Sequence, residues 1–414
     1  WWDNLWGKFQ FTGLPLQANI DVSGRWKDLS RRDIFGSGEI SSATYKGAPF
    51  ERVQGQLRCI PKYTELFDLN AKFPDGYAQG RLAWPLHPEE RSHVTSRRFN
   101  LRGKLNLETA GKLFGSKVEK VLADFTVEET PDVVAEGVLF GKGPFDFLEK
   151  PPLNDFTVQS QAGKGTFLSI PLDFLEIDLR NLGHAITIDP LHFGFADGKG
   201  EGWLKHRHNP EGPPMEFSIH LKDADKHLAI QNLSQNPKLN LKPSKPPKKK
   251  ATIQAFQIHA TGDHGDLSSF DGSGSFALRD PGLAQINMLG LFSKELKRFT
   301  LPLISYSFDR MEAKFKLRKQ FMVFDPQPLI VRGPTSKLDA TGRFNLKTRE
   351  LYFKVRLLQL GLLPLAGILE MNLGGTIDKP VWNPKVKPSE TLDPVKPLNP
   401  KNGKSLPLKS KDQK

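Results

Sequence analysis

The sequence has few residues that could cross-link the chain or anchor it. Among its 414 residues there is one cysteine, Cys59, so no intramolecular disulfide bond can form. It contains no signal-peptide pattern and no run of about 18 apolar residues, so no transmembrane helix is predicted within it. Such a chain fits the cytosol and, equally, a periplasmic protein that uses no disulfides.

The common catalytic motifs are also missing. The sequence has no phosphate-binding GxxxxGK[ST] pattern, no zinc-protease HExxH pattern and no GxSxG nucleophile elbow. Its ten histidines are scattered, and the closest pair, His206 and His208, stands beside Pro210 and is predicted to lie in an exposed loop. We therefore expect a protein that is not an enzyme and that has no metal site and no cofactor.

Basic residues outnumber acidic ones, but the excess is confined to two segments. Of the net charge of +13, residues 238–250 carry +6 and residues 383–414 carry +5. The remaining body is close to neutral, so no basic groove for nucleic acid is expected. We predict a Pro/Lys-rich linker or loop at 238–250 and a disordered basic tail at 383–414. Contact of these segments with an anionic membrane surface is the alternative.

Alternation of apolar and polar residues is what the sequence has in abundance. In residues 99–107, for example, Phe, Leu and Gly alternate with Asn, Arg and Lys. A period of two predicts β-strands with one apolar face and one polar face. Short turn-bounded runs of this kind recur along most of the chain up to residue 382. Three short helices are expected at 108–122, 223–233 and 283–296.

Residues 338–382 show this organisation most clearly. Two alternating runs, 340–346 and 351–357, are separated by four polar residues and predict an antiparallel hairpin. The apolar run that follows, 357–369, is too short to span a bilayer. It is predicted to pack as a buried helix, with a lid or a membrane-touching plug as the alternative. A last strand is expected at 371–377.

The same stretch resembles the C-terminal region of the AsmA-like family, large periplasmic proteins of the envelope of diderm bacteria. The shared features are a strand ending at Gly342–Asn345, a second alternating strand, a short Leu/Pro/Gly segment and a closing Gly-Thr-Ile-Asp-Lys-Pro-Val-Trp at 375–382. The resemblance is good over 251–382, the AsmA-like C-terminal β region, and looser over 1–237. None of these motifs is catalytic, so the resemblance supports a prediction of the architecture more strongly than a prediction of the activity.

Many one-sided strands with few helices pose a physical problem, because every apolar face must be covered. A sheet closed on itself, a sandwich, or a bent sheet with another molecule inside would each cover it. The AsmA-like family resembles the bridge-like lipid-transfer proteins. That resemblance implies a mainly β fold, an elongated curved antiparallel β-sheet groove shaped like a taco, with a few short helices. Acyl chains would slide along its apolar lining while head groups stay at the wet edge.

The residues expected to line this groove are apolar members of the alternating runs. They are Phe99, Leu101, Leu105, Phe193, Phe195, Phe315, Leu317, Phe344, Phe353 and Val355. For each of them, ordinary packing in a sandwich core is the alternative. Residues expected to contact a membrane are Trp1, Trp2, Trp6, Leu362 and Leu363.

The function that the resemblance implies is conduction of phospholipids between the inner and outer membranes, in outer-membrane biogenesis and lipid homeostasis. It implies a periplasmic location, an inner-membrane anchor before Trp1, and envelope proteins as partners. Two other classes stay open. A non-enzymatic scaffold for outer-membrane protein assembly would have a dry two-sheet core. A β-rich adhesin or carbohydrate-binding domain would need exposed aromatic residues, at which only Trp203 and Tyr352 hint.

Overall fold

The computed structural model of the chain describes most residues between Phe9 and Asn383. The described ranges are 9–13, 16–25, 27, 32–60, 63–84, 96–114, 119–120, 122–140, 154–207, 214–239, 241, 250–263, 266–283, 308–334, 336–360 and 363–383. Trp1, Trp2, Trp6, Leu362 and the tail 383–414 beyond Asn383 lie outside them. The side chain of Leu363 is not described either, so the predicted membrane contacts stay predictions.

One open antiparallel sheet of 21 strands forms the body of the molecule. Its strands are β1 (Phe9–Phe11), β2 (Gln17–Gly24), β3 (Arg32–Tyr45), β4 (Ala48–Ile60), β5 (Tyr63–Phe73), β6 (Gly76–Trp84), β7 (Ser96–Lys104), β9 (Asp132–Phe140), β10 (Asp155–Ala162), β13 (Phe174–Leu182), β14 (Ala185–Phe195), β15 (Gly198–Arg207), β16 (Met215–Asp225), β17 (Thr252–Gly262), β18 (Asp271–Arg279), β19 (Arg310–Arg318), β20 (Phe321–Arg332), β21 (Ser336–Asn345), β22 (Leu351–Leu360), β23 (Leu363–Gly375) and β24 (Pro380–Asn383). From β3 onward each strand pairs with the next one along the chain, and both β1 and β2 pair with β3.

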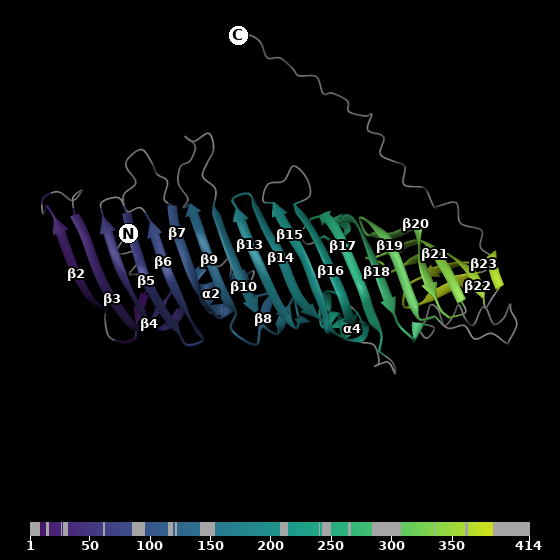
Figure 1. Cartoon of the computed structure of the whole chain (residues 1–414), viewed down its shortest axis with the longest axis horizontal. Helices are drawn as coiled ribbons and strands as arrows, with labels where there is room; N and C mark the ends of the chain where they lie inside the picture. The colour runs from purple at the N-terminus through teal and green to yellow at the C-terminus, as the bar shows by residue number, and fades with distance from the viewer. Residues whose placement is uncertain are drawn as a thin grey trace, which may run out of the picture.

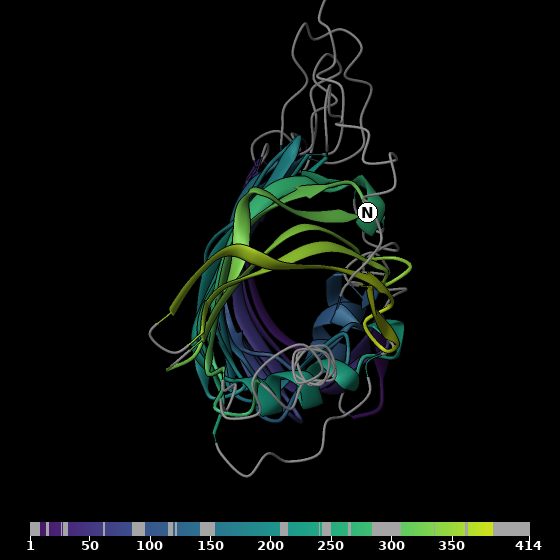
Figure 2. The same ribbon diagram turned by 90° about the vertical axis from the view of Figure 1, so that its right-hand side faces the viewer.

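The strands stand side by side along the long axis of the molecule (Figure 1). Seen down that axis, the sheet curves into an open trough (Figure 2). Tight turns connect neighbouring strands, so that each strand can pair with the one that follows it. At the β3–β4 and β14–β15 turns, both central residues have positive φ: 52° and 79° at Lys46 and Gly47, and 52° and 63° at Ala196 and Asp197. That backbone matches the twist of hairpin strands. The prediction of a mainly β, curved antiparallel groove is therefore confirmed.

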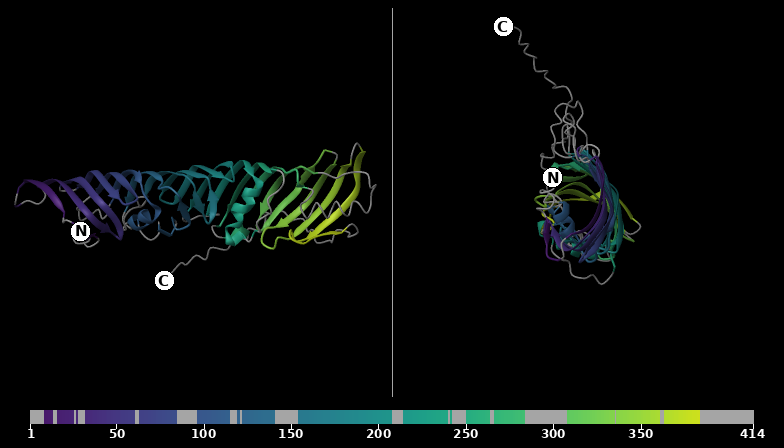
Figure 3. Two further views of the ribbon diagram at one scale, coloured as in Figure 1. Left: turned by 90° about the horizontal axis from the view of Figure 1, so that it is seen from below. Right: turned by 90° about the vertical axis from the view of Figure 1, so that its left-hand side faces the viewer.

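Two short helices and a small second sheet lie along one edge of the trough (Figures 1 and 3). Helix α2 covers Leu107–Phe114, and α4 covers Lys226–Ser234. Asp225 caps α4, since its Oδ1 accepts hydrogen bonds from the backbone N–H groups of His227 and Leu228 at 2.8 and 3.0 Å. The small sheet contains β8 (Phe125–Val127), β11 (Gly165–Phe167) and β12 (Ile170–Leu172).

The helix predictions had mixed outcomes. Helices overlap the predicted ranges 108–122 and 223–233, as α2 at 107–114, which is shorter than expected, and α4 at 226–234. Most of the third predicted helix, 283–296, lies outside the described residues. The helix predicted at 357–369 is wrong, while the alternatives of a lid or a membrane-touching plug stay predictions. This run belongs to β22 and β23, which pair as a hairpin in which Leu357 is opposite Leu369. The first residues of the run, 357–360, extend β22 and pair with residues 336–338 of β21, so strand pairing takes precedence over a helical turn.

The segment 238–250 connects two neighbouring strands of the same sheet. Strand β16 before it and β17 after it pair along most of their length, from Met215 opposite Gly262 to Asp225 opposite Thr252. The regions 1–237 and 251–382 thus contribute to one continuous sheet. His206 lies within β15, opposite Met215, so its predicted place in an exposed loop is wrong, while His208 is outside the described residues.

We predict that Gly342→Ala lowers the stability of the C-terminal strands. Gly342 has a φ of +152°, and a Cβ there would stand 2.0 Å from the carbonyl oxygen of Tyr352 on the neighbouring strand. The substitution should cost about 1–3 kcal/mol of unfolding free energy, measured by urea denaturation. Gly374→Ala is the control, because its Cβ would come no closer than 3.9 Å to another atom. Equal midpoints for the two variants would contradict the prediction.

Candidate functional site

The strand register places the apolar residues of successive strands in straight rows on one face. Residues directly opposite each other in antiparallel strands share a face and contact each other. A first row crosses the sheet from β3 to β19 without interruption. It consists of Ile40, Val53, Ala71, Ala78, Gly103, Val133, Ser160, Ile177, Leu191, Gly202, Ile219, Ile258, Gly274 and Phe315. Ser160 is its one polar member.

A second row runs beside the first, two residues further along each strand. It extends from β5 to β22 and contains only apolar residues and glycine. Its members are Leu69, Gly80, Leu101, Ala135, Val158, Leu179, Ile188, Leu204, Phe217, Ala260, Gly272, Leu317, Met322, Phe344 and Leu351. We call the face that carries both rows the floor.

The floor is the concave face of the trough. Leu113 of α2 packs against the floor residues Ile40 and Ala71, and Leu228 of α4 packs against Phe195 and its neighbours. Both helices lie on the inside of the curve or along its edge (Figure 2). The apolar rows therefore line the inside of the groove.

The residues predicted to line the groove all belong to this face. Phe315 is in the first row, and Leu101, Leu317 and Phe344 are in the second. The remaining predicted residues lie on the same side of their strands or pack against floor residues. These are Phe99, Leu105, Phe193, Phe195, Phe353 and Val355. Their role as a lipid lining stays a prediction.

Glycines in and beside the rows were not named among the predicted lining residues, although they are part of the floor. Gly200 is opposite Phe193, and a Cβ on Gly200 would stand 2.2 Å from the tip of that ring. Gly274 is opposite Phe315, with a corresponding distance of 2.4 Å. A phenylalanine ring thus lies over a glycine on the neighbouring strand. The sequence signal for this was a glycine at an apolar position of the alternation.

The convex face is polar. Glu176, His192, Glu201, His220 and Gln257 are opposite one another on successive strands from β13 to β17. His192 Nδ1 is 3.7 Å from Glu176 Oε2, and His220 Nδ1 is 3.7 Å from Glu201 Oε1. Cross-strand ion pairs continue along the sheet, such as Lys354 Nζ with Glu370 Oε1 at 2.7 Å. This face is therefore suited to water.

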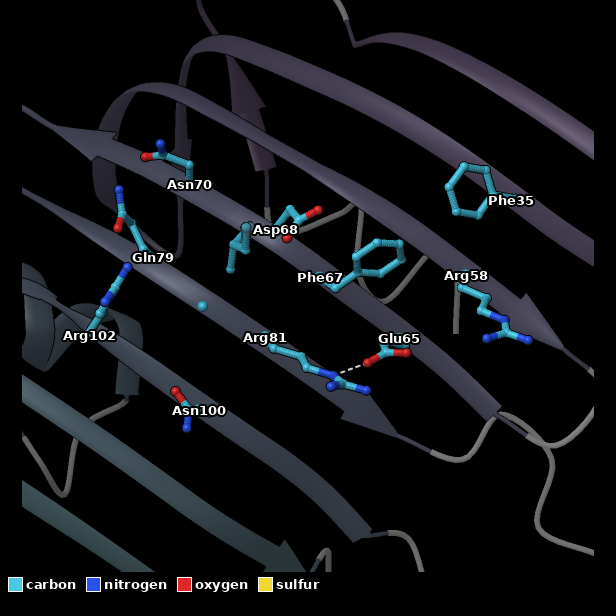
Figure 4. Close-up of a pocket in the computed structure, with 12 residues that line it drawn as sticks. Phe35, Arg58, Glu65, Phe67, Asp68, Asn70, Gln79, Arg81, Asn100 and Arg102 are labelled. Atoms are coloured by element: carbon cyan, nitrogen blue, oxygen red, sulfur yellow. Dashed lines mark ion pairs between the residues drawn. The ribbon is translucent and has the colours of Figure 1, made fainter.

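A depression of about 780 Å³ lies on the same polar side, across strands β3 to β7 (Figure 4). Phe35 and Phe67 line one end, with their ring centroids 6.1 Å apart. In the middle, Arg81 forms an ion pair with the buried carboxylate of Glu65, and this hydrogen bond raises the pKa of Arg81 above its ordinary value. These contacts are those of a solvated surface stabilised by ion pairs, and the floor residues Leu69 and Gly80 also line the depression.

Burial along the floor is uneven. Four clusters of buried apolar residues lie under α2, under α4 and over the C-terminal strands β18–β23. In the C-terminal cluster, Leu338 and Leu357 are 1% and 0% exposed, and Leu283 and Phe308 cover them. By contrast, the described residues of β7, β9, β10 and β13 include no buried side chain. The middle of the floor is apolar and lacks a cover among the described residues.

No group of three or more His, Cys, Asp or Glu side chains is placed to hold a metal ion in the described ranges. Within the same part of the chain, no helix is long and apolar enough to cross a membrane. Comparison of the chain with protein families, with curated proteins and with solved structures gave no significant match.

We predict that two leucines of the floor differ sharply in their contribution to stability. Leu357→Ala should cost about 2–5 kcal/mol, because the side chain is fully buried and leaves a cavity. Leu101→Ala should cost about 1 kcal/mol or less, because that side chain is partly exposed already. Amide hydrogen exchange of the surrounding strands measures both costs locally. Equal costs would mean that the middle of the floor is covered as well.

Proposed function

We propose that this protein binds phospholipids by their acyl chains along the floor and conducts them between two membranes. The observation that carries the proposal is the pair of rows, apolar apart from Ser160, whose middle has no protein cover among the described residues. At about 4.8 Å between neighbouring strands, the 21-stranded sheet measures about 90 Å across its strands. This exceeds the roughly 30 Å hydrocarbon core of a bilayer, so the floor is long enough to lead away from a membrane.

The energetics of such a floor favour movement over storage. Removing a methylene group from water contributes about 0.8 kcal/mol, so an acyl chain strongly prefers the floor to water. A bilayer offers the same gain, however, and the free-energy difference between bilayer and floor is therefore small. A lipid can enter at one membrane, slide along rows of similar side chains and leave at another. No bond is formed or broken, and no cofactor is required.

The cellular setting that we propose follows from the AsmA-like motifs at 342–345 and 375–382. These motifs, together with a curved groove, support an AsmA-like protein in the periplasm of a diderm bacterium. Its partners would be the inner and outer membranes and other envelope proteins, and its role would be outer-membrane lipid supply.

A second candidate function, a dry scaffold for outer-membrane protein assembly, is favoured by the C-terminal end of the sheet. There Leu283 and Phe308, 0% and 1% exposed, cover the floor with the chain's own side chains. The adhesin alternative receives less support. Tyr352 is 42% exposed on β22, and Trp203 lies on β15 against the ring of His259. The two aromatic residues are separated by several strands and form no common platform.

We predict that a negative charge on the floor abolishes lipid binding, whereas the same charge on the other face does not. Val133 is in the first row of the floor, and Val134, its neighbour on β9, points to the polar face and is 44% exposed. Val133→Asp should lower the amount of co-purifying phospholipid at least about tenfold, because a carboxylate is costly among acyl chains. Extraction and mass spectrometry of the bound lipid provide the measurement.

Val134→Asp is the matched control and should retain the lipid of the unaltered protein. Circular dichroism should show the same strand content for both variants. If both variants retain lipid, the floor is not its binding site.

A further inference from the structure

The inward-facing residues become polar toward one edge of the groove. We call this edge, at the top of Figure 1, the upper rim. It is formed by the strand ends at Trp84, Ser96, Phe140, Asp155, Leu182, Ala185 and Arg207. The opposite edge, where α2, α4 and the small sheet lie, is the lower rim.

Three polar side chains stand on the floor side at the upper rim. Arg97 is two residues from Phe99 on β7 and therefore shares its face. Asn181 is opposite Phe156 and Ile186, and Ile186 is opposite His206. Deeper rows at the same strands are apolar, with Leu179, Ile188 and Leu204 next in line. On β7, β13 and β15 the inner face thus changes from polar to apolar along the strand, as an amphiphilic ligand does along its length, whereas Phe156 and Ile186 keep the inner faces of β10 and β14 apolar up to the rim.

Two of these groups are suited to a polar ligand. Asn181 Oδ1 is a buried side-chain oxygen without a hydrogen-bond donor among the described residues, so it can accept from a donor such as the ammonium of an ethanolamine head group, while the Nδ2 of the same amide is the atom that can donate to a phosphate. Arg97 is exposed. Burial raises the pKa of Tyr45, which packs in the cluster that also holds Leu113 of α2, and the positive charge of Arg97 acts against this rise. A guanidinium is also the side chain that binds phosphate best, through paired charge-assisted hydrogen bonds.

Among the described residues, the lower rim offers a lipid head group no comparable place. Leu113 of α2 packs on the floor at the end of β5, and Leu228 and Leu233 of α4 pack beside Phe195. Ile170 of the small sheet joins the same cluster. A phosphate at this edge would have to displace apolar side chains from one another, at a cost that the upper rim does not impose.

The depth of the groove matches the length of one acyl chain. From Leu175 near the lower rim to Asn181 near the upper rim, β13 measures about 20 Å at about 3.3 Å per residue. One leaflet of a bilayer, half of a hydrocarbon core of about 30 Å, is about 15 Å deep. A lipid can therefore lie across the groove, with its chains along the strands and its head group at one rim.

We propose that the upper rim is the head-group side of the groove: phosphate head groups contact Arg97, Asn181 and His206, and the acyl chains run along the strands toward the lower rim. This proposal rests on the proposed function, since it assigns an orientation to the lipid on the same floor. It identifies the ligand class as two-part amphiphiles with an anionic phosphate, and it makes Arg97 and Asn181 positioning residues for that phosphate.

Two photoreactive phosphatidylethanolamines test the orientation with the complete chain. One carries a diazirine on its head group, and the other carries it at the end of an acyl chain. After illumination, mass spectrometry locates the adducts. Head-group adducts are expected on 96–99, 139–140 and 181–186, and chain-end adducts near Leu175, Phe193 and Leu221. Head-group adducts at the lower rim, or equal distributions for both probes, would overturn the orientation. Absence of adducts from both probes on the floor would instead overturn the proposed function.

Arg97→Leu and Arg98→Leu form a matched pair, because these neighbours on β7 lie on opposite faces of the sheet. Arg97→Leu should reduce head-group adducts on 96–99 roughly tenfold, the loss typical of one charge-assisted hydrogen bond. Its chain-end adducts should be unchanged. Arg98→Leu should alter neither. Equal head-group labelling of the two variants would contradict a phosphate contact at Arg97, while retained chain-end labelling would leave lipid binding by the floor intact.

Discussion

The structure depends on one constraint: a sheet with a single apolar face needs something to cover it. A continuous floor of two apolar rows runs through most of the 21 strands, and no second large sheet packs on it in the described residues. Within the described part of the chain, only α2, α4 and a three-stranded sheet are added to the large sheet, and they reach one edge. Apolar surface exposed to water costs about 25 cal/mol per Å². Curvature reduces this exposure, and in the proposed function a ligand with acyl chains removes the rest.

The distribution of cover divides the groove into parts with different properties. Toward the C-terminal strands, side chains such as Phe308 and Leu357 fill the space and form an ordinary core. Between β7 and β13 the floor is partly exposed throughout. If the floor served stability alone, covering its middle strands as the C-terminal strands are covered would make the protein more stable. An open middle with polar residues at one rim has the arrangement expected of a passage for amphiphiles.

Much of this architecture could be predicted from the alternation of residues, because a period of two fixes the face of each side chain once a strand is accepted. The groove-lining residues Leu101 and Phe344 were found in this way, although their shared row depends on the register, which the sequence does not display. Apolar content without a clear period misled the prediction at 357–369, where pairing with β21 decides the structure. Arg97 and Asn181 were missed because a polar residue at an inward position only interrupts the pattern. Whether such a residue can contact a ligand depends on the rim of the groove at which it lies.

The most direct test of the central claim is a count of lipids on the intact protein. The chain would be purified in mild detergent and examined by native mass spectrometry, with the released lipids identified by extraction. The account predicts a folded, strand-rich protein that carries more than one phospholipid per chain. A fully folded chain that carries none, and that takes up none from phospholipid vesicles, would contradict it, because the floor would then be covered by the protein itself.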